Sequence, residues 1–385
     1  MIWPERYCRG RWCNIRAYVI LIVAIWLFVF LDTWIRPKQP ERQQFGNIKT
    51  QRVTPTNKEM TCMNGTGELS SSQLVITRTH TQQCDIVATM VQRYGYKHQL
   101  SFAIGQDTSV ISHDEKFRRN MGSVVPRHQP KALQYTKKQY NVLASYVRFN
   151  KPEINAVVPN ATYITVIVEP SYHLQYVFNL YSVDRSLHIN KYRNPLEKFM
   201  ETPQMYIDKR FKFWFQLHNG QLFDLGFDDS EYRLDRVKQK IVELERELDF
   251  VLIGEYLDES LVVLKKKLCL EWKDIMYLPI RNVIPENRRY TTETLRRQIL
   301  DWNAADSLLY QHFNKTLWIE IGIYGPSFQS DLFHHKTSKQ RLWDDCLVAR
   351  SAVNDDIKLK PNAGDFCNFL YRSEKELWKV LGNKQ

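Results

Sequence analysis

The sequence predicts an α/β domain, with a mostly parallel sheet and helices on both faces, preceded by an N-terminal transmembrane helix. Short apolar and β-branched runs at Gln73–Thr77, Thr162–Val168 and Phe250–Ile253 are typical of buried strands. Segments with apolar residues at helical spacing follow them, which favours parallel pairing because parallel strands need long crossover connections. An unbroken apolar run, Ala17–Leu31, predicts the membrane helix.

The apolar run is long enough to cross a bilayer. Together with Asp32–Ile35 it covers 19 residues, within the range of about 17–25 that spans hydrocarbon. Four arginines and one glutamate precede it, so the positive-inside bias places residues 1–16 in the cytosol and the rest in the lumen. No small-residue cleavage site follows the run, which argues against a cleaved signal peptide. We expect an uncleaved signal anchor over 17–35 and a single-pass type II topology.

A lumenal domain is also indicated by glycosylation acceptors and cysteines. Asn-x-Ser/Thr triplets occur at Asn64, Asn160 and Asn314. Five cysteines follow the anchor, and an oxidising lumen favours disulfides among them, although an odd number leaves at least one unpaired or bonded to another chain. Their spacing does not resemble a zinc site, so we expect no metal.

Two segments with different composition follow the anchor. Residues 36–72 are polar, with several prolines and a Gln/Asn/Thr-rich stretch, and they indicate a stem. Residues 73–385 are enough for one large lumenal domain. The formal charge of +12 favours an anionic donor or acidic glycans, and nucleic acid is not expected as a partner of a lumenal protein.

The first strand leads into a tight turn and a helix. The turn is Arg78–Cys84, and the helix is expected over Asp85–Tyr94, where Asp85 could simply be its N-cap. Further along, residues 290–325 are expected to be mainly helical. Their apolar side chains should pack this segment onto the domain: Trp302, Leu308, Leu309, Phe313 and Leu317.

Two blocks in the second half of the chain are more specific than any strand or helix pattern. They are DFVLIGEYLDESLVVL at Asp249–Leu264 and WNAADSLLYQHFNKTLW at Trp302–Trp318, with NGQLFDLGFD at Asn219–Asp228 ahead of them. Each block alone would be a core strand or a core helix. In this order the blocks closely resemble the galactose-3-O-sulfotransferases, of which the chain would be a divergent member, and the resemblance covers Gln73–Cys346.

The resemblance implies a fold and an activity. The fold is the P-loop-like sulfotransferase fold. The activity is that of a Golgi enzyme, held in the membrane by its own anchor, that transfers sulfate from 3′-phosphoadenosine 5′-phosphosulfate (PAPS) to a galactose hydroxyl, expected to be the 3-OH. The acceptor would be a glycolipid such as galactosylceramide or a glycoprotein glycan.

The resemblance also places the donor site at the turn after the first strand, where backbone N–H groups and a helix N-terminus suit a phosphosulfate. Family members carry two lysines there. Arg78 takes the place of the first and Thr81 replaces the second, while Thr79 and His80 match. The candidate donor-binding residues are Arg78, Thr79, Thr81, Gln82, Gln83, Cys84, Asp85, Arg148 and Glu169.

Catalytic residues are implied in the same way. His80 is the candidate general base, with a hydrogen-bonded loop histidine as the alternative, and Arg78 is the candidate cation. Ser145 stands where relatives have one of two histidines, ahead of the matching Arg148. Glu255 and the acidic pair after it match the family, but such a cluster can also serve packing and capping.

Several family residues are replaced, which leaves a second function open. Thr81 carries no charge, Cys84 replaces a glycine, Val168 stands where relatives have arginine, and Tyr176 stands where they have serine. The alternative is therefore a catalytically inactive sulfotransferase-fold protein that binds a glycan or a partner in the secretory pathway. A different group transfer from an altered donor is a third possibility. Cys269 and Cys346 match family cysteines and are the implied disulfide pair.

Overall fold

The computed structural model describes residues 73–104, 110–121, 139–207, 213–228, 233–278, 292–348 and 358–382. The expected anchor at 17–35, the stem at 36–72 and the acceptor Asn64 lie outside the described residues. Among the residues that the structure does describe, no helix combines the length and apolar character needed to span a membrane.

A five-stranded sheet forms the centre of the described domain, and its strand order is β2-β3-β1-β4-β5. Every pair of neighbouring strands is parallel, as the sequence predicted. The strands are β1 (Leu74–Thr77), β2 (Phe102–Ala103), β3 (Val142–Leu143), β4 (Thr162–Ile167) and β5 (Phe250–Ile253). Almost every strand residue is buried, which explains why these segments are near-continuous apolar runs.

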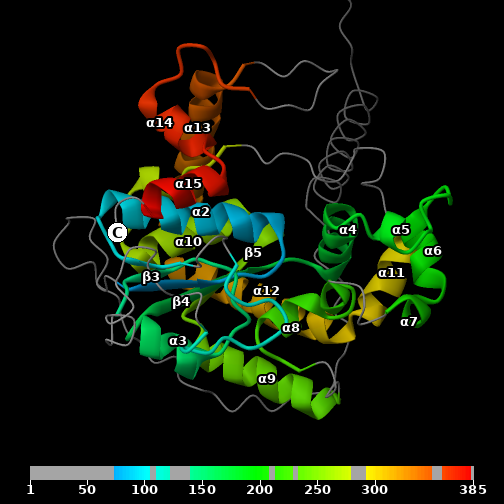
Figure 1. The fold of residues 1–385 in the computed structure, drawn as a ribbon. Helices are drawn as coiled ribbons and strands as arrows, with labels where there is room; N and C mark the ends of the chain where they lie inside the picture. The colour runs from blue at the N-terminus through cyan, green and yellow to red at the C-terminus, as the bar shows by residue number, and fades with distance from the viewer. Residues whose placement is uncertain are drawn as a thin grey trace, which may run out of the picture. The chain divides into compact units, whose positions relative to one another are not determined.

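Helices cover both faces of the sheet (Figure 1). The helices α2, α10 and α15 lie on one side, and α3 and α9 lie on the other. The helices are α2 (Gln82–Lys97), α3 (Lys151–Val157), α4 (Pro170–Leu180), α5 (Val183–Ser186), α6 (Pro195–Glu201), α7 (Pro203–Tyr206), α8 (Gly220–Asp224), α9 (Leu234–Glu247), α10 (Leu257–Leu268), α11 (Glu293–Trp302), α12 (Ala304–Tyr324), α13 (Ser327–Cys346), α14 (Asp365–Tyr371) and α15 (Glu374–Gly382). Short 3₁₀ helices are η2 (Trp214–Gln216), η4 (Gly254–Tyr256) and η5 (Trp272–Ile275).

Two apolar cores hold these elements together. The larger core surrounds the sheet and includes Leu309, Phe313 and Leu317 of α12, which confirms the packing expected for this helix. The smaller core joins α4, α6 and α11, and Trp302 packs against it. Leu308 is partly buried against the larger core. The helix α12 therefore connects the sheet to the smaller group of helices.

The helix after the first strand begins earlier than predicted. Thr81 is the N-cap of α2, and its hydroxyl accepts a hydrogen bond from the backbone N–H of Cys84 at 3.1 Å. Asp85 therefore lies in the first turn of the helix and is not its cap. A capping threonine satisfies one of the N–H groups that a helix start leaves open, and the extended backbone of Thr81 is typical of an N-cap residue.

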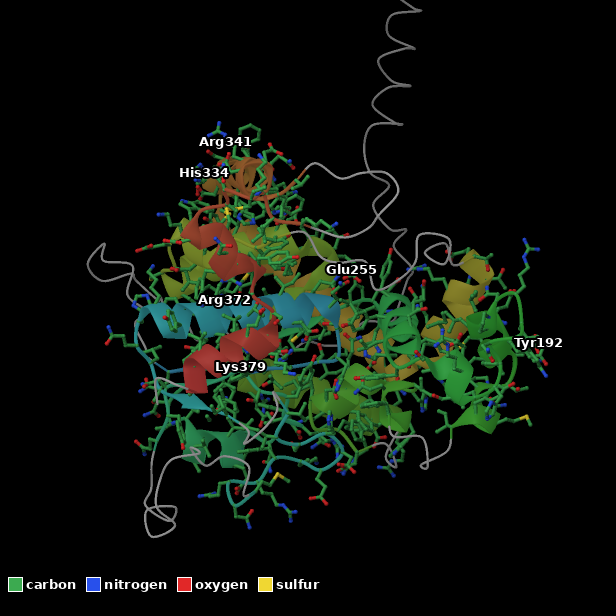
Figure 2. All side chains as sticks on the ribbon, turned by 45° about the horizontal axis from the view of Figure 1, so that its top comes forward. Tyr192, Glu255, His334, Arg341, Arg372 and Lys379 are labelled. Atoms are coloured by element: carbon green, nitrogen blue, oxygen red, sulfur yellow. A yellow bond between two sulfur atoms is a disulfide. The ribbon has the colours of Figure 1, made fainter. Side chains whose placement is uncertain are left out.

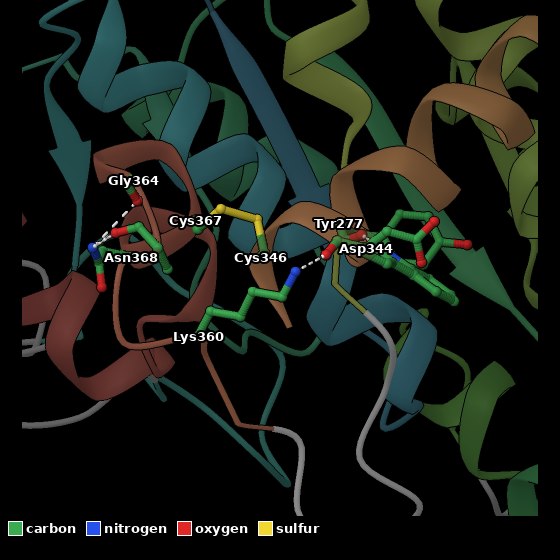
Figure 3. Close-up of a disulfide and its surroundings, with 9 residues drawn as sticks. Tyr277, Asp344, Cys346, Lys360, Gly364, Cys367 and Asn368 are labelled. Atoms are coloured by element: carbon green, nitrogen blue, oxygen red, sulfur yellow. Dashed lines mark hydrogen bonds between the residues drawn. A yellow bond between two sulfur atoms is a disulfide. The ribbon is translucent and has the colours of Figure 1, made fainter. Parts of the chain in front are cut away.

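The expected Cys269–Cys346 disulfide is wrong, because Cys346 is bonded to Cys367 (Figure 3). The chain reverses after α13, where Leu347 pairs with Leu359, and this reversal brings α14 over the end of α13 with a Cα–Cα distance of 5.3 Å between the two cysteines. Lys360 also donates a hydrogen bond to the carbonyl of Asp344 at 2.5 Å. Cys269 is disulfide-bonded as well, but not to Cys346.

Removing the Cys346–Cys367 bridge is expected to lower the free energy of unfolding by about 3 kcal/mol, the cost of releasing a loop of this length in the unfolded chain. Urea unfolding of the full chain with Cys367→Ser measures this loss. The double variant with Cys346→Ser should lose no more than the single variant, because both remove the same bond. Additive losses would contradict the pairing.

Candidate functional site

A pocket lies where β1, β4 and β5 end, at the carboxyl edge of the sheet, where ligands of parallel α/β folds bind. Its volume is about 140 Å³. Glu255, on its rim, lies at the boundary between the helices that cover the sheet and the group formed by α4, α5 and α11, and Tyr192 lies at the far side of that group (Figure 2). The lining residues are Thr81, Gln82, Gln83, Val168, Tyr172, His173, Tyr176 and Glu255.

The pocket offers amides and hydroxyls to a ligand rather than positive charge. Among the described residues that line it there is no lysine or arginine, and Glu255 contributes a carboxyl group whose pKa burial raises to about 7. Glu255 is held in place, since its Oε1 accepts a hydrogen bond from the backbone N–H of Glu169 at 2.6 Å. Pockets that bind small molecules usually have volumes of about 300–1,000 Å³, so this pocket is smaller than most of them.

Glycine at position 254 lets β5 approach the pocket wall. A Cβ atom there would lie 2.5 Å from Cγ1 of Val168 and 3.1 Å from Cγ of Gln83. The first contact is closer than real side chains show, and the second would require Gln83 to shift by a few tenths of an ångström. The close approach brings Gln83 in the first turn of α2, Val168 just after β4 and the start of η4 into one wall of the pocket.

Arg78 is buried, and carboxylates surround its guanidinium. It binds Asp85 Oδ1 at 2.7 Å, forms an ion pair with Glu374 of α15, and lies over the ring of Tyr146 at 3.7 Å. Its side chain is 0% exposed, whereas Asp85 and Glu374 are partly exposed at the edge of the cluster. Burial alone would lower the pKa of Arg78, but the nearby Tyr146 and the two carboxylates raise it above its usual value. The cation is therefore neutralised within the protein.

Glu374 is held by several donors. Besides Arg78, the indole N–H of Trp378 donates to its Oε1 at 3.2 Å, and the Gln92 side chain donates at 3.3 Å. The ion pair between Arg78 and Glu374 could not be predicted from the local sequence pattern, because α15 lies far from Arg78 in the sequence. Arg78, the candidate catalytic cation, is not among the residues that line the pocket. Its guanidinium connects Asp85 of α2 to Glu374 of α15.

His80 forms an ordered pair with Asp224. Its Nδ1 lies 2.8 Å from Oδ2 of Asp224, which also accepts the backbone N–H of His80 at 3.0 Å. His80 is 5% exposed. Its Nε2 is buried and has no hydrogen-bond partner among the described residues. Asp224 favours the tautomer with the proton on Nδ1, which leaves Nε2 as a proton acceptor, the arrangement of a general base oriented by a carboxylate.

A chain of hydrogen bonds joins this pair to the pocket. Gln216 donates to Oδ1 of Asp224 at 2.8 Å, and its own Oε1 lies 3.1 Å from Nε2 of His173, which lines the pocket. A Cβ at Gly220 would lie 2.7 Å from Oε1 of Gln216 and 2.8 Å from Cε1 of His173. Gly220 therefore leaves room for this connection.

Two of the blocks that carry the family resemblance, Asn219–Asp228 and Trp302–Trp318, bind each other and hold Asp224 in position. Asn219 accepts the backbone N–H groups of Ala305 and Asp306, at 3.0 and 3.1 Å. In return Asp306 accepts the N–H groups of Gln221 and Leu222, at 3.1 and 2.8 Å. These bonds cap α8 and α12 against each other. Sequence reasoning missed the role of Asp224, although it lies in the quoted NGQLFDLGFD block.

Arg148 and Ser145 lie apart from the pocket lining. Arg148 is buried and donates to the carbonyls of Phe223 at 3.0 Å and Phe227 at 2.6 Å, so its guanidinium ties the segment after β3 to the end of α8. Ser145 is 0% exposed, and its hydroxyl has no partner among the described residues.

The remaining donor candidates are divided between the pocket and the core. Thr81, Gln82 and Gln83 line the pocket. Thr79 donates to the carbonyl of Val166 at 2.6 Å in the core. Burial raises the pKa of the Cys84 thiol to about 12, which keeps it protonated and unreactive. Glu169 accepts the hydroxyl of Ser171 at 2.5 Å and is paired with Arg296 of α11.

The acidic pair after Glu255 does serve packing. Asp258 binds Lys339 and His335 of α13 and the hydroxyl of Tyr277, which attaches α10 to α13. The glycosylation acceptors differ in exposure: Asn160 is exposed after α3, whereas Asn314 is half-buried within α12. Over the described residues, no group of three or more His, Cys, Asp or Glu side chains could hold a metal ion.

A pH dependence is expected from His173. Burial lowers the pKa of its imidazole to about 4, whereas an unfolded chain titrates near 6.5. Between these values the unfolded state binds more protons, so the free energy of unfolding falls as the pH drops, by about 3 kcal/mol at most. His173→Gln keeps a polar group without titration and should lose this part of the dependence. Urea unfolding of both proteins near neutral pH and near pH 4 measures it, and equal losses would contradict it.

Comparisons with known proteins support the family resemblance that the sequence blocks indicate. The sequence model of the family described as Galactose-3-O-sulfotransferase matches residues 42–363, which extends the resemblance at both ends. The bovine galactosylceramide sulfotransferase is 32% identical over 300 residues, 75% of this chain and 68% of the relative. The mouse galactosylceramide sulfotransferase is 32% identical over 258 residues, and the alignment spans 58% of its length.

The mouse galactose-3-O-sulfotransferase 2 is 26% identical over 309 residues, 78% of this chain and 77% of the relative. The strands β1, β4 and β5, the His80–Asp224 pair and the capping bonds between α8 and α12 all lie within the matched region. Glu374, which neutralises Arg78, lies beyond it. The chain belongs to the galactose-3-O-sulfotransferase family, a family of sulfotransferase enzymes.

Proposed function

We propose that this protein is a Golgi sulfotransferase that moves the sulfuryl group of PAPS to the 3-hydroxyl of a galactose, on a glycolipid such as galactosylceramide or on a glycoprotein glycan. We further propose that residues 17–35 anchor it as a single-pass type II membrane protein, with the described domain in the lumen. The relatives that it matches are named for galactosylceramide and galactose.

The observation that carries the proposal is the His80–Asp224 pair. Transfer to a hydroxyl requires a base that removes the hydroxyl proton as the new bond forms. His80 Nε2 is a buried acceptor without a partner among the described residues, and Asp224 stabilises the imidazolium that forms. Hydrogen bonds through Asp224 and Gln216 connect His80 to His173, which lines the pocket at the start of α2, and this connection supports the proposal.

The pocket fits the donor only in part. The N-terminus of α2 and the Thr81 hydroxyl suit an anion, and PAPS would supply the activated sulfuryl group there. The lysine that relatives carry is replaced by Thr81, and no lysine or arginine is among the described lining residues. We therefore assign proton removal to His80 and leave stabilisation of the leaving phosphate unassigned.

Transfer to a defined hydroxyl tests the proposal. The full chain in detergent would be incubated with PAPS and either galactosylceramide or its 3-deoxygalactosyl analogue, and the products would be identified by mass spectrometry. Sulfated product is expected from the first acceptor alone. Sulfation of both acceptors would place the reaction on another hydroxyl, and sulfation of neither by a folded chain would reject the activity.

A second function is favoured by one observation, the neutralised cation. Because Asp85 and Glu374 occupy the guanidinium of Arg78, the protein could retain the fold and bind a glycan or a partner without catalysis. Calorimetric titration with phosphoadenosine phosphate separates the two functions. A catalyst must bind this product of its donor, whereas a binding module without a donor site should give no heat.

A further inference from the structure

The helix α12 carries apolar side chains on two opposite faces. One face packs against β5, which forms an edge of the sheet. On the other face Trp318, Ile319 and Ile323 are 46%, 54% and 69% exposed. Because these residues are one to five positions apart, they lie on one side of the last two turns of the helix. Helices that are apolar all round are normally buried, so the exposed face is suited to a contact outside the domain.

Positive charge flanks these apolar side chains at both ends. Lys315 precedes them by one turn on the same face and is exposed. At the other end, the exposed Lys266 of α10 donates to the carbonyl of Tyr324 at 3.2 Å, and its Nζ lies 3.9 Å from the centre of the Tyr324 ring. Glu320, a carboxylate beside this face, is neutralised by Lys267 at 3.0 Å. Tryptophan and aliphatic side chains flanked by lysine are the composition that binds anionic membrane surfaces.

The exposed face of α12 adjoins the pocket. The ring of Trp318 meets the ring of Tyr256 edge to face, with centroids 5.1 Å apart. Tyr256 directly follows Glu255, which lines the pocket. A lipid surface in contact with Trp318 would therefore lie next to the pocket. Galactosylceramide carries a single sugar, so its hydroxyls stay close to the lipid surface and an enzyme that acts on them must approach that surface.

The size of this face favours a membrane over a second copy of the chain. A stable interface between proteins buries about 800 Å² on each partner. A fully buried aromatic side chain contributes about 150–250 Å², and the three apolar side chains of this face are only partly exposed. They are too few to hold a dimer. A weak membrane contact is sufficient when a second attachment, here the proposed anchor, keeps the domain at the bilayer.

We propose that the face formed by Lys315, Trp318, Ile319 and Ile323 rests on the anionic lipid surface that carries the glycolipid acceptor, and that this contact holds the pocket beside the acceptor sugar. The apolar side chains enter the headgroup region, and Lys315 binds the negative headgroups. The inference rests on the proposed function for its acceptor, but contact with lipid is measured without catalysis. A galactoside that is free in water does not depend on the contact.

Quenching by brominated lipid tests the contact. The full chain with Ile319→Cys, labelled with an environment-sensitive fluorophore, would be reconstituted into vesicles of phosphatidylcholine and phosphatidylserine, and labelled wild-type protein would give the background from the native cysteines. The control is Gln99→Cys, which is exposed just before β2 at the opposite edge of the sheet from β5. Quenching is expected at position 319 and not at position 99. No quenching at 319, or equal quenching at both positions, overturns the proposal.

A kinetic comparison tests what the contact does. The double variant Ile319→Asp with Ile323→Asp places charge on the exposed face and should raise KM for galactosylceramide in these vesicles roughly tenfold, since it weakens membrane contact. Its kinetics with methyl β-galactoside should stay unchanged, and Met205→Asp, at a 78% exposed position on α7, should affect neither acceptor. Quenching without sulfate transfer would reject the proposed activity and retain the contact. Transfer to galactosylceramide that the double variant leaves unchanged would retain the activity and reject the contact.

Discussion

Replacing His80 with alanine is expected to lower the rate of sulfate transfer by roughly 10²- to 10⁴-fold, the usual contribution of a positioned general base. The reason is that Nε2 of His80 is a buried acceptor whose tautomer Asp224 fixes. Asp224→Asn should also lower the rate, since an amide at that position can donate to Nδ1 and turn Nε2 into a donor. Initial rates with saturating galactosylceramide measure both effects.

The control is a histidine of the same domain that lies far from the sheet edge. His334 is exposed on α13 (Figure 2), and His334→Ala should leave the rate unchanged. Folding must be checked separately because His80 is buried, so each variant needs an unfolding midpoint close to that of the wild-type protein. A His80→Ala variant that is folded and fully active would remove His80 from the reaction.

Arg78→Ala is expected to destabilise the fold by roughly 3 kcal/mol, because it leaves two carboxylates without their cation. Asp85 and Glu374 converge on the same buried guanidinium, so each would face the negative charge of the other once the cation is gone. Tyr146 would also lose the cation stacked on its ring. Urea unfolding of the full chain measures the loss.

A matched pair of variants separates this structural role from donor binding. Arg78→Lys keeps the charge without the planar fork, so it should lose less stability than alanine. In the double variant Arg78→Ala with Glu374→Gln, one unpaired charge is gone and part of the lost stability should return. An Arg78→Ala protein that retains its stability but no longer binds phosphoadenosine phosphate would instead assign Arg78 to the donor.

The fold could be predicted closely where local pattern decides the structure. The strand Phe250–Ile253 has the expected bounds because a short apolar run that contains β-branched and aromatic residues favours a strand. The start of α2 was placed too late because Thr81, rather than Asp85, satisfies the first open N–H group. Caps depend on backbone geometry that a residue type only suggests.

Features that join distant parts of the chain could not be predicted. The Cys346–Cys367 bond depends on a chain reversal after α13, whereas family position suggested Cys269. The neutralisation of Arg78 depends on Glu374, 296 residues away in the sequence. Local sequence carries no information on which side chains the fold brings together at such separations.

The candidate site was predicted in part, for the same reason. Gln82 and Gln83, two of the candidate donor-binding residues, line the pocket because they lie at the start of the helix that follows the first strand. The role of Asp224 was not predicted, because its partner lies outside the Asn219–Asp228 block that contains it. Its partner is His80, which lies 144 positions earlier and reaches it only because β1 and α8 end at the same edge of the sheet.

Sulfate transfer by the intact protein tests the central claim most directly. The full wild-type chain and its His80→Ala variant would be mixed with radiolabelled PAPS and galactosylceramide under single-turnover conditions, and label in the lipid would be followed over time. The claim that the His80–Asp224 pair serves a working galactose sulfotransferase predicts label in the lipid with wild-type protein and far slower labelling with the variant. Absence of label with a folded wild-type chain would contradict it and leave a sulfotransferase fold that serves binding alone.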